Sequence, residues 1–165
     1  MNASSLQKVD HAALKANQMT IILLNILAFV FNLPWLALFV AVVMLLGVIR
    51  FAPGFYWVYK YVLKPAGILK PDVLEDNREP HRFAQLLGSV FMFAGAAFLF
   101  MKFSALGWAF VWLVIALAAL NAFGGFCAGC AVYYWLGRMR VSGFIKQPPA
   151  GTFPGMRPKG ADNES

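Results

Sequence analysis

A run of 31 residues without a charged side chain, residues 19–49, constrains the fold of this chain more than any other feature. Two further stretches, 83–101 and 103–138, carry at most one charge, at an edge. Each run meets or exceeds the roughly 20 apolar residues that a helix needs to cross a bilayer. Apolar residues make up 61% of the chain and charged residues 13%, against about a half and a quarter in globular proteins. The sequence therefore predicts an all-α, polytopic membrane protein.

The first apolar run is too long for one span. As a straight helix it would extend about 46 Å, well beyond a hydrocarbon core of about 30 Å. Pro34 removes a backbone donor and disfavours helix in the residue before it. We therefore expect a hairpin with one span over 12–31 and a second over 34–51. A single tilted and kinked helix is the alternative, which would give three spans instead of four.

The other two spans are expected over residues 83–101 and 108–136, after a cytoplasmic loop over 52–82. An acid before a proline marks the start of the third span, at Glu79 and Pro80. Small residues including Gly88 and Gly95 give this span a face that a neighbouring helix can approach closely. The chain then divides into an N-terminal segment, 1–11, a membrane domain, 12–140, and a Pro- and Gly-rich tail, 141–165, which we expect to be disordered.

Positive charges orient the predicted bundle. With four spans, every one of the 14 Lys and Arg residues except Lys102 falls on the side of the two termini. Because Lys and Arg concentrate on the cytoplasmic side of membrane proteins, we expect both termini in the cytoplasm. The net charge of +7 does not indicate nucleic-acid binding, because no soluble stretch is long enough to form a basic domain.

The most specific motif is Cys127-Ala-Gly-Cys130, which holds the two cysteines of the chain. Three residues apart on a helix, the thiols share a face and can form a disulfide, share a metal or exchange with a partner thiol. If Gly124 and Gly125 loosen the helix, Cys127 begins a new half-helix, which favours its thiolate. In a reducing cytoplasm we expect a dithiol or a transient disulfide. The alternative is that both cysteines are small packing residues.

Polar residues at the start of the third span are candidates to support the thiols. His81 or Arg82, if close to the cysteines, would lower a thiol pKa or bind an anionic substrate. The alternative for Arg82 is ordinary interfacial anchoring. A zinc site of Cys127, Cys130, His81 and His11 is a weaker hypothesis, because no His-x3–5-His spacing supports it. We expect no cofactor.

Among the amides of the predicted spans, Asn25 lies within the first span and Asn121 deep in the fourth. Buried amides in lipid must find partners, and we expect interhelical hydrogen bonds for both. A polar substrate path is the alternative. The predicted spans contain no embedded acid or base, which argues against a proton relay of the pump type.

Several of these motifs together resemble a known family. They are Asn17-Gln18, a linker with Pro65, the run from Pro80 to Gln85 with Gly88, and Asn121 followed by Cys127-x-Gly129-Cys130 and Tyr133. In this order they resemble an uncharacterised bacterial membrane family, domain of unknown function 4395, over residues 9–138. The resemblance implies a multi-pass protein of the bacterial inner (cytoplasmic) membrane whose signature includes the helix-borne cysteine pair. It favours a functional role for the pair but supplies no reaction.

Three functions follow as hypotheses. The first is a membrane dithiol in which Cys127 or Cys130 attacks and the other resolves, exchanging disulfide or sulfane sulfur with a cytoplasmic thiol carrier. The second is a structural or accessory subunit of a larger membrane complex. The third is a permease for a small sulfur-containing anion that uses Arg82 and Asn121. Whether the chain is an enzyme stays open, and the lipid bilayer is its expected partner in every case.

Overall fold

The computed structural model describes residues 7–149 and 151–158. This part of the chain is mostly helical, with six α-helices, a short π-helical turn and two short strands. In chain order the elements are β1 (Gln7–Asp10), α1 (His11–Val30), α2 (Pro34–Ile49), α3 (Tyr56–Val58), η1 (Tyr59–Leu63), β2 (Val73–Asp76), α4 (Arg78–Phe100), α5 (Ser104–Gly124) and α6 (Ala128–Arg138). The predicted helical class is confirmed, whereas the two strands were not expected.

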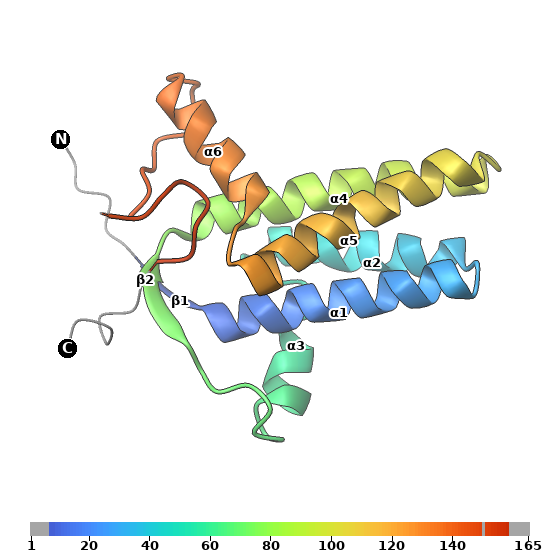
Figure 1. Cartoon of the computed structure of the whole chain (residues 1–165), viewed down its shortest axis with the longest axis horizontal. Helices are drawn as coiled ribbons and strands as arrows, with labels where there is room; N and C mark the ends of the chain where they lie inside the picture. The colour runs from blue at the N-terminus through green and yellow to red at the C-terminus, as the bar shows by residue number, and fades with distance from the viewer. Residues whose placement is uncertain (1–6, 150, 159–165) are drawn as a thin grey trace.

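Four helices form the bundle that dominates the molecule (Figure 1). Helix α1 packs against α2 and α5, and α4 packs against α2 and α5, so the four close into a ring. Three of them, α1, α4 and α5, are long and apolar enough to cross a membrane, while α2 is a shorter apolar helix of 16 residues. The chain turns between α1 and α2 directly before Pro34, because proline is tolerated at the first position of a helix but not inside it.

Small residues let the helices approach closely. Gly95 on α4 faces Gly107 on α5, and a Cβ added at Gly107 would lie 2.9 Å from the Gly95 carbonyl oxygen. Ala16, Ala28, Ala37 and Ala41 are fully buried on α1 and α2. Without a hydrophobic drive between helices in lipid, such close backbone packing supplies much of the association energy.

The last predicted span, 108–136, is two helices in the structure. Helix α5 ends at Gly124, Gly125 adopts a left-handed conformation with φ of +63°, and α6 begins at Ala128. Glycine reaches this region of backbone space at little cost, and a left-handed residue directly after the last helical turn ends the helix. Helix α6 leaves the bundle in a new direction and packs on α4 (Figure 1).

The N-terminal segment and the loop before α4 pair as a small antiparallel sheet. Strand β1 lies against β2 with Gln7 opposite Asp76 and Asp10 opposite Val73. Asp10 also caps α1, because its Oδ1 accepts hydrogen bonds from the backbone N–H groups of Ala12 and Ala13. The sheet therefore fixes the start of α1 beside the start of α4.

The tail is packed rather than disordered over residues 141–149 and 151–158. The ring of Phe144 lies 5.4 Å from that of Phe83 on α4 and 5.0 Å from that of Tyr133 on α6. Met156 forms a β-bridge with Phe126, and Arg157 forms an ion pair with Asp72. Aromatic and backbone contacts thus hold these parts of the tail against α4, α6 and the loop before α6. The remaining tail residues, 150 and 159–165, lie outside the described residues.

Candidate functional site

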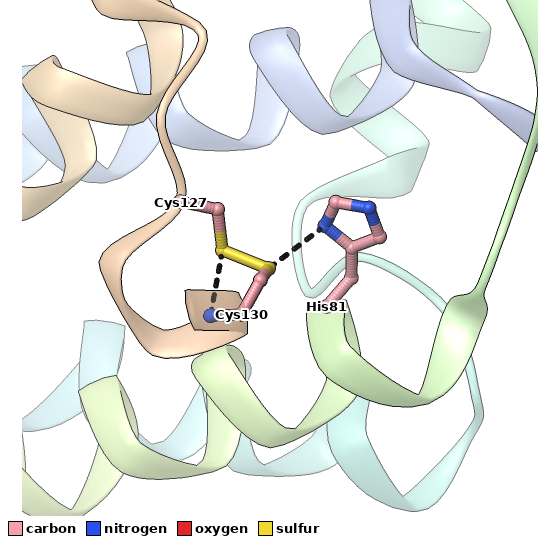
Figure 2. Close-up of side chains that lie close together, drawn as sticks. All are labelled: His81, Cys127 and Cys130. Atoms are coloured by element: carbon pink, nitrogen blue, oxygen red, sulfur yellow. Dashed lines mark hydrogen bonds between the residues drawn. A yellow bond between two sulfur atoms is a disulfide. The ribbon is translucent and has the colours of Figure 1, made fainter. Parts of the chain in front are cut away.

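The two cysteines lie at the break between α5 and α6, where they are joined as a disulfide (Figure 2). Cys127 is the N-cap residue of α6, and its Sγ accepts a hydrogen bond from the Cys130 N–H at 3.2 Å. Both residues are buried, with 5% and 3% of their surface exposed. We expected a reduced dithiol or a transient bond from the sequence, and the structure holds the oxidised form of the pair.

The glycine inside the motif sets the position of the pair against α4. A Cβ at Gly129 would lie 2.6 Å from the Cβ of Ala84, so only glycine lets α6 approach α4 this closely. His81 precedes Ala84 by three residues and therefore shares its face of α4. The close contact brings the His81 ring to the sulfur of Cys130, with 3.5 Å between Nδ1 and Sγ.

His81 links the cysteine pair to a buried carboxylate. Its Nε2 lies 2.9 Å from Oδ2 of Asp76, on the opposite side of the ring from Cys130. A cysteine sulfur, an imidazole and a carboxylate therefore lie in sequence, which is the order found in sites that activate a nucleophilic cysteine. In the neutral ring, the nitrogen beside the carboxylate carries the proton. Nε2 of His81 is therefore protonated, and Nδ1, which faces Cys130, is not.

Asp76 is 4% exposed and lies at the end of β2. Burial raises the pKa of this carboxyl, but interactions with His11 and His81 and a hydrogen bond from the Asn77 N–H outweigh it. The net pKa is well below its usual range. Asp76 is therefore ionised at neutral pH. His11, the first residue of α1, lies on the other side of the carboxylate with its Nε2 3.3 Å from Oδ2.

The cysteines and the histidines line one cavity of about 420 Å³ at this end of the bundle. Helix α1 contributes His11 and Gln18, α5 contributes Asn121, and the tail contributes Gly155 and Arg157. The tail also contacts the cysteine pair directly, since the carbonyl of Gly155 accepts a hydrogen bond of 2.7 Å from the Cys127 N–H. A smaller cavity of about 80 Å³, also lined by Cys127 and Asn121, lies among α1, α4 and α5.

Arg82 does not join the cysteines. Its Nε donates to the carbonyl of Val48 in the last turn of α2 at 2.9 Å, and its guanidinium lies 3.7 Å above the centre of the Phe51 ring. This carbonyl also accepts the Phe51 N–H at 3.4 Å in the turn that ends α2, and the added bond from Arg82 anchors α4 to α2. The anion-permease hypothesis thereby loses its cationic residue, because Asn121 lines the cavity without Arg82.

The predicted interhelical bond of Asn25 is also absent from the described structure. Asn25 is fully buried, but its Nδ2 donates to the Ile21 carbonyl of the same helix at 3.0 Å. Polar side chains in apolar helices bond backward to the preceding turn when no facing partner is within reach.

Asp76 and the tail segment around Gly155 belong to the site, but the sequence did not predict them. Asp76 sits among three other acids in the 72–79 stretch, so composition alone does not single it out. One feature could have pointed to Asp76: it precedes His81 by only five residues, and the start of α4 lies between them. The tail lacked any signal, because Pro- and Gly-rich composition predicts disorder regardless of the contacts available.

The proposed four-residue zinc set does not form as one group. The potential metal ligands among the described residues gather instead into two groups of three that share His81: His81 with Cys127 and Cys130, and His81 with His11 and Asp76.

The architecture defines a class: a small helical protein with membrane-length helices and a buried cysteine–histidine–aspartate arrangement at one end. A family model described as "Domain of unknown function (DUF4395)" matches residues 9–138, and the chain belongs to this family. Neither a curated protein nor a solved structure matches the chain significantly. The family match covers every residue of the site except the tail contacts at Gly155 and Arg157.

Proposed function

We propose that this protein is a membrane thiol–disulfide exchange protein in which Cys127 and Cys130 form the redox pair. One observation carries the proposal: the pair lines a 420 Å³ cavity and Cys130 Sγ lies 3.5 Å from the Nδ1 of His81. A pair that served only for packing would not need a polar cavity beside it. The cavity gives a partner thiol access to sulfurs that are otherwise buried.

The two sulfurs differ in their surroundings, and this difference assigns their roles. Cys127 Sγ accepts the N–H of Cys130 at the N-terminus of α6, where the helix favours a thiolate. Cys130 Sγ faces Nδ1 of His81, and the imidazolium form of this ring, protonated on both nitrogens, can donate a proton to a leaving sulfur. Cys127 is therefore the sulfur that a partner attacks, and Cys130 is the leaving and resolving sulfur.

The exchange proceeds in two displacements. A thiolate of a partner dithiol attacks Cys127 Sγ, the Cys127–Cys130 bond breaks, and its electron pair leaves on Cys130, which takes a proton from the His81 imidazolium. The second thiol of the partner loses its proton to the neutral His81 ring, attacks the partner sulfur of the mixed disulfide and releases Cys127 as a thiolate, which takes from solvent the proton that the first partner thiol gave up. The partner dithiol is oxidised to a disulfide by two electrons, and the cysteine pair is reduced to two thiols. The reverse sequence reduces a partner disulfide.

The charge distribution supports a cytoplasmic partner. The cavity lies at the end of the bundle that carries the strands and the tail, because His11, Asp76 and Gly155 line it. Among the described residues, Lys102, between α4 and α5, is the one Lys or Arg at the opposite end of the helices. Cytoplasmic ends of spans are rich in Lys and Arg. We place both termini in the cytoplasm and the helices in the bacterial inner membrane, so the partner is a soluble or membrane-attached thiol carrier.

Single-cysteine variants test the proposal. In cells expressing Cys130→Ser, the remaining Cys127 should accumulate a mixed disulfide with its partner, seen as a shifted band that a reductant removes. Cys127→Ser should accumulate at least about tenfold less, because the attacked sulfur is missing. The double variant is the matched control and should form no adduct.

Two outcomes contradict the proposal. If neither single variant forms an adduct while both fold as wild type, the redox role is wrong. The second outcome concerns the double variant. If it co-purifies with a larger membrane complex at the same stoichiometry as the wild-type protein and supports wild-type thiol oxidation, the cysteines are packing residues of an accessory subunit.

A further inference from the structure

The second group of donors around His81 has the geometry of a metal site. Oδ2 of Asp76 lies 2.9 Å from Nε2 of His81 and 3.3 Å from Nε2 of His11, and all three atoms are within 4.8 Å of one another. A divalent ion about 2.1 Å from each ligand separates neighbouring ligand atoms by about 3.0 Å in an octahedral site and about 3.4 Å in a tetrahedral one. Both distances to Asp76 fall close to this range.

The protein groups alone leave this cluster unsatisfied. Nε2 of His11 is buried and forms no hydrogen bond with the described residues, although it lies 3.3 Å from Oδ2 of Asp76. His11 is 9% exposed, so its ring is largely shielded from bulk water. An unpaired buried polar atom costs about 1–3 kcal/mol, and a metal ion would remove this cost.

Three separate elements hold the donors before any ion binds. His11 begins α1, where its own N–H donates to the Asp72 carbonyl at 2.7 Å. Asp76 ends β2, and its second oxygen, Oδ1, accepts the Asn77 N–H at 2.7 Å. His81 lies in the first turns of α4, which is anchored to α2. Ligands fixed in this way by outer hydrogen bonds are typical of metal sites in proteins.

We propose that His11, Asp76 and His81 bind a first-row divalent transition-metal ion such as Zn²⁺. Two imidazoles and one carboxylate form a set of three ligands that leaves further coordination positions open. Those positions face the 420 Å³ cavity, which all three residues line. The site thus has room for water or a small substrate ligand beside the ion.

The competing group, His81 with Cys127 and Cys130, requires reduced cysteines, since only the thiolate is a metal ligand. In this structure the cysteines are a disulfide, while the His11, Asp76 and His81 atoms face one another regardless of it. The two groups also use different nitrogens of His81: Nδ1 faces Cys130 and Nε2 faces Asp76. The metal site therefore does not depend on the thiol exchange proposed above.

Cobalt binding to the purified full-length protein tests the site. In the Cys127→Ser/Cys130→Ser background, Co²⁺ should bind at one ion per chain, with ligand-field absorption bands and no thiolate charge-transfer band. Asp76→Asn and His11→Gln should each weaken binding by at least about 10- to 100-fold, the range measured when outer-shell partners of a metal are lost. Glu75→Gln, an exposed neighbour with the same change of charge, should bind as wild type.

Three results would overturn the site: no binding to the cysteine-free protein, wild-type binding by Asp76→Asn and His11→Gln, or equal weakening by Glu75→Gln. Helical circular dichroism and gel filtration of each variant separate lost binding from lost folding. If Asp76→Asn does not fold, His11→Gln decides alone, because that change keeps an amide of similar size in place of the ring. Zn²⁺ measured by elemental analysis of the protein purified without chelator gives the identity of the bound ion.

Discussion

At one end of the bundle, the chain turns between helices with only three linking residues each time, at 31–33 and 101–103. This turn end is held by aromatic contacts, such as that between Trp35 and Phe100 at 4.7 Å. At the other end, the site end, Figure 1 shows the two strands, α6 and the tail. His11, Asp76, His81 and the cysteine pair contact one another there. The same four helices run between both ends. They form the scaffold, whereas the candidate site depends on the strands, α6 and the tail at the site end.

The strongest test of this comparison is the side of the membrane on which each end lies. In the Cys127→Ser/Cys130→Ser background, a cysteine placed at Ser104 of the turn end should react in intact cells with a membrane-impermeant maleimide. A cysteine at Ser142 of the site end should react only after the cells are permeabilised. The reason is the concentration of Lys and Arg at the site end. Labelling of position 142 but not 104 in intact cells would reverse the orientation.

Two glycine substitutions should separate the roles of the two ends. Gly107→Ala places a Cβ 2.6 Å from Leu99 Cγ near the turn end, and Gly129→Ala places one 2.6 Å from Ala84 at the site end. Each should lower stability by about 1–3 kcal/mol through overpacking. Only Gly129→Ala should also slow exchange of the disulfide with a small dithiol, by roughly tenfold, because it moves Cys130 away from His81.

Thermal unfolding and stopped-flow thiol exchange measure the two effects. Equal slowing of exchange by Gly107→Ala would mean that the ends are not independent.

Removing the tail should expose the cysteine pair at the site end and leave the turn end unchanged. A chain that stops after residue 149 lacks the Gly155 carbonyl that accepts from Cys127 and the Arg157 side chain that pairs with Asp72. Its disulfide should be reduced roughly fivefold faster, as expected for a lost hydrogen bond of about 1 kcal/mol and a more open cavity. A chain that stops after residue 158 is the control and should match the full chain. Equal reduction rates in both would show that the tail contacts do not protect the pair.

The smallest expected effect concerns Tyr59, which supports the site end from η1. Its hydroxyl donates to Asp10 Oδ2 at 2.8 Å. Burial, followed by this hydrogen bond to the carboxylate, raises its pKa to about 12. The neutral phenol is thus favoured in the folded state, so its contribution is complete below about pH 10, the unfolded value, and is lost as the pH rises toward 12. Tyr59→Phe should cost about 1 kcal/mol at pH 7 and lose less stability above pH 10 than wild type.

Chemical unfolding at several pH values checks this prediction. Tyr61→Phe, which alters an exposed tyrosine two residues away, should unfold as wild type throughout. A wild-type curve without an alkaline decline relative to Tyr59→Phe would contradict the role of the hydroxyl.

The parts of the fold that the sequence predicts well depend on local composition. The apolar runs reveal the long helices, and Pro34 reveals the turn between α1 and α2, because both signals act within one segment. The division of residues 108–136 into α5 and α6 was harder to predict. Gly124 and Gly125 permit a break, but whether they cause one depends on the contact of Gly129 with Ala84, which is far away in sequence.

The candidate site was predictable to the same extent: signals within one segment were visible in the sequence, and contacts between distant segments were not. The Cys127-x-x-Cys130 spacing and the polar start of α4 mark two of its parts in the sequence. These two parts lie close together only because α6 packs against α4. Asp76 and His11 lie beside them only because β1 pairs with β2. Arg82 and His81 are adjacent in sequence, yet they point to different neighbours because successive helical residues lie about 100° apart on the helix. Sequence alone does not decide which of the two faces the cysteines.

The Gly155–Cys127 hydrogen bond has a consequence for how the protein is made. The described chain begins with the strand that places His11 and ends with the segment that covers Cys127, so its first and last residues both belong to the site end. A nascent chain still attached to the ribosome has its helices before it has this covering segment. The cysteine pair therefore passes through a stage of synthesis in which the helices are complete and the sulfurs are uncovered.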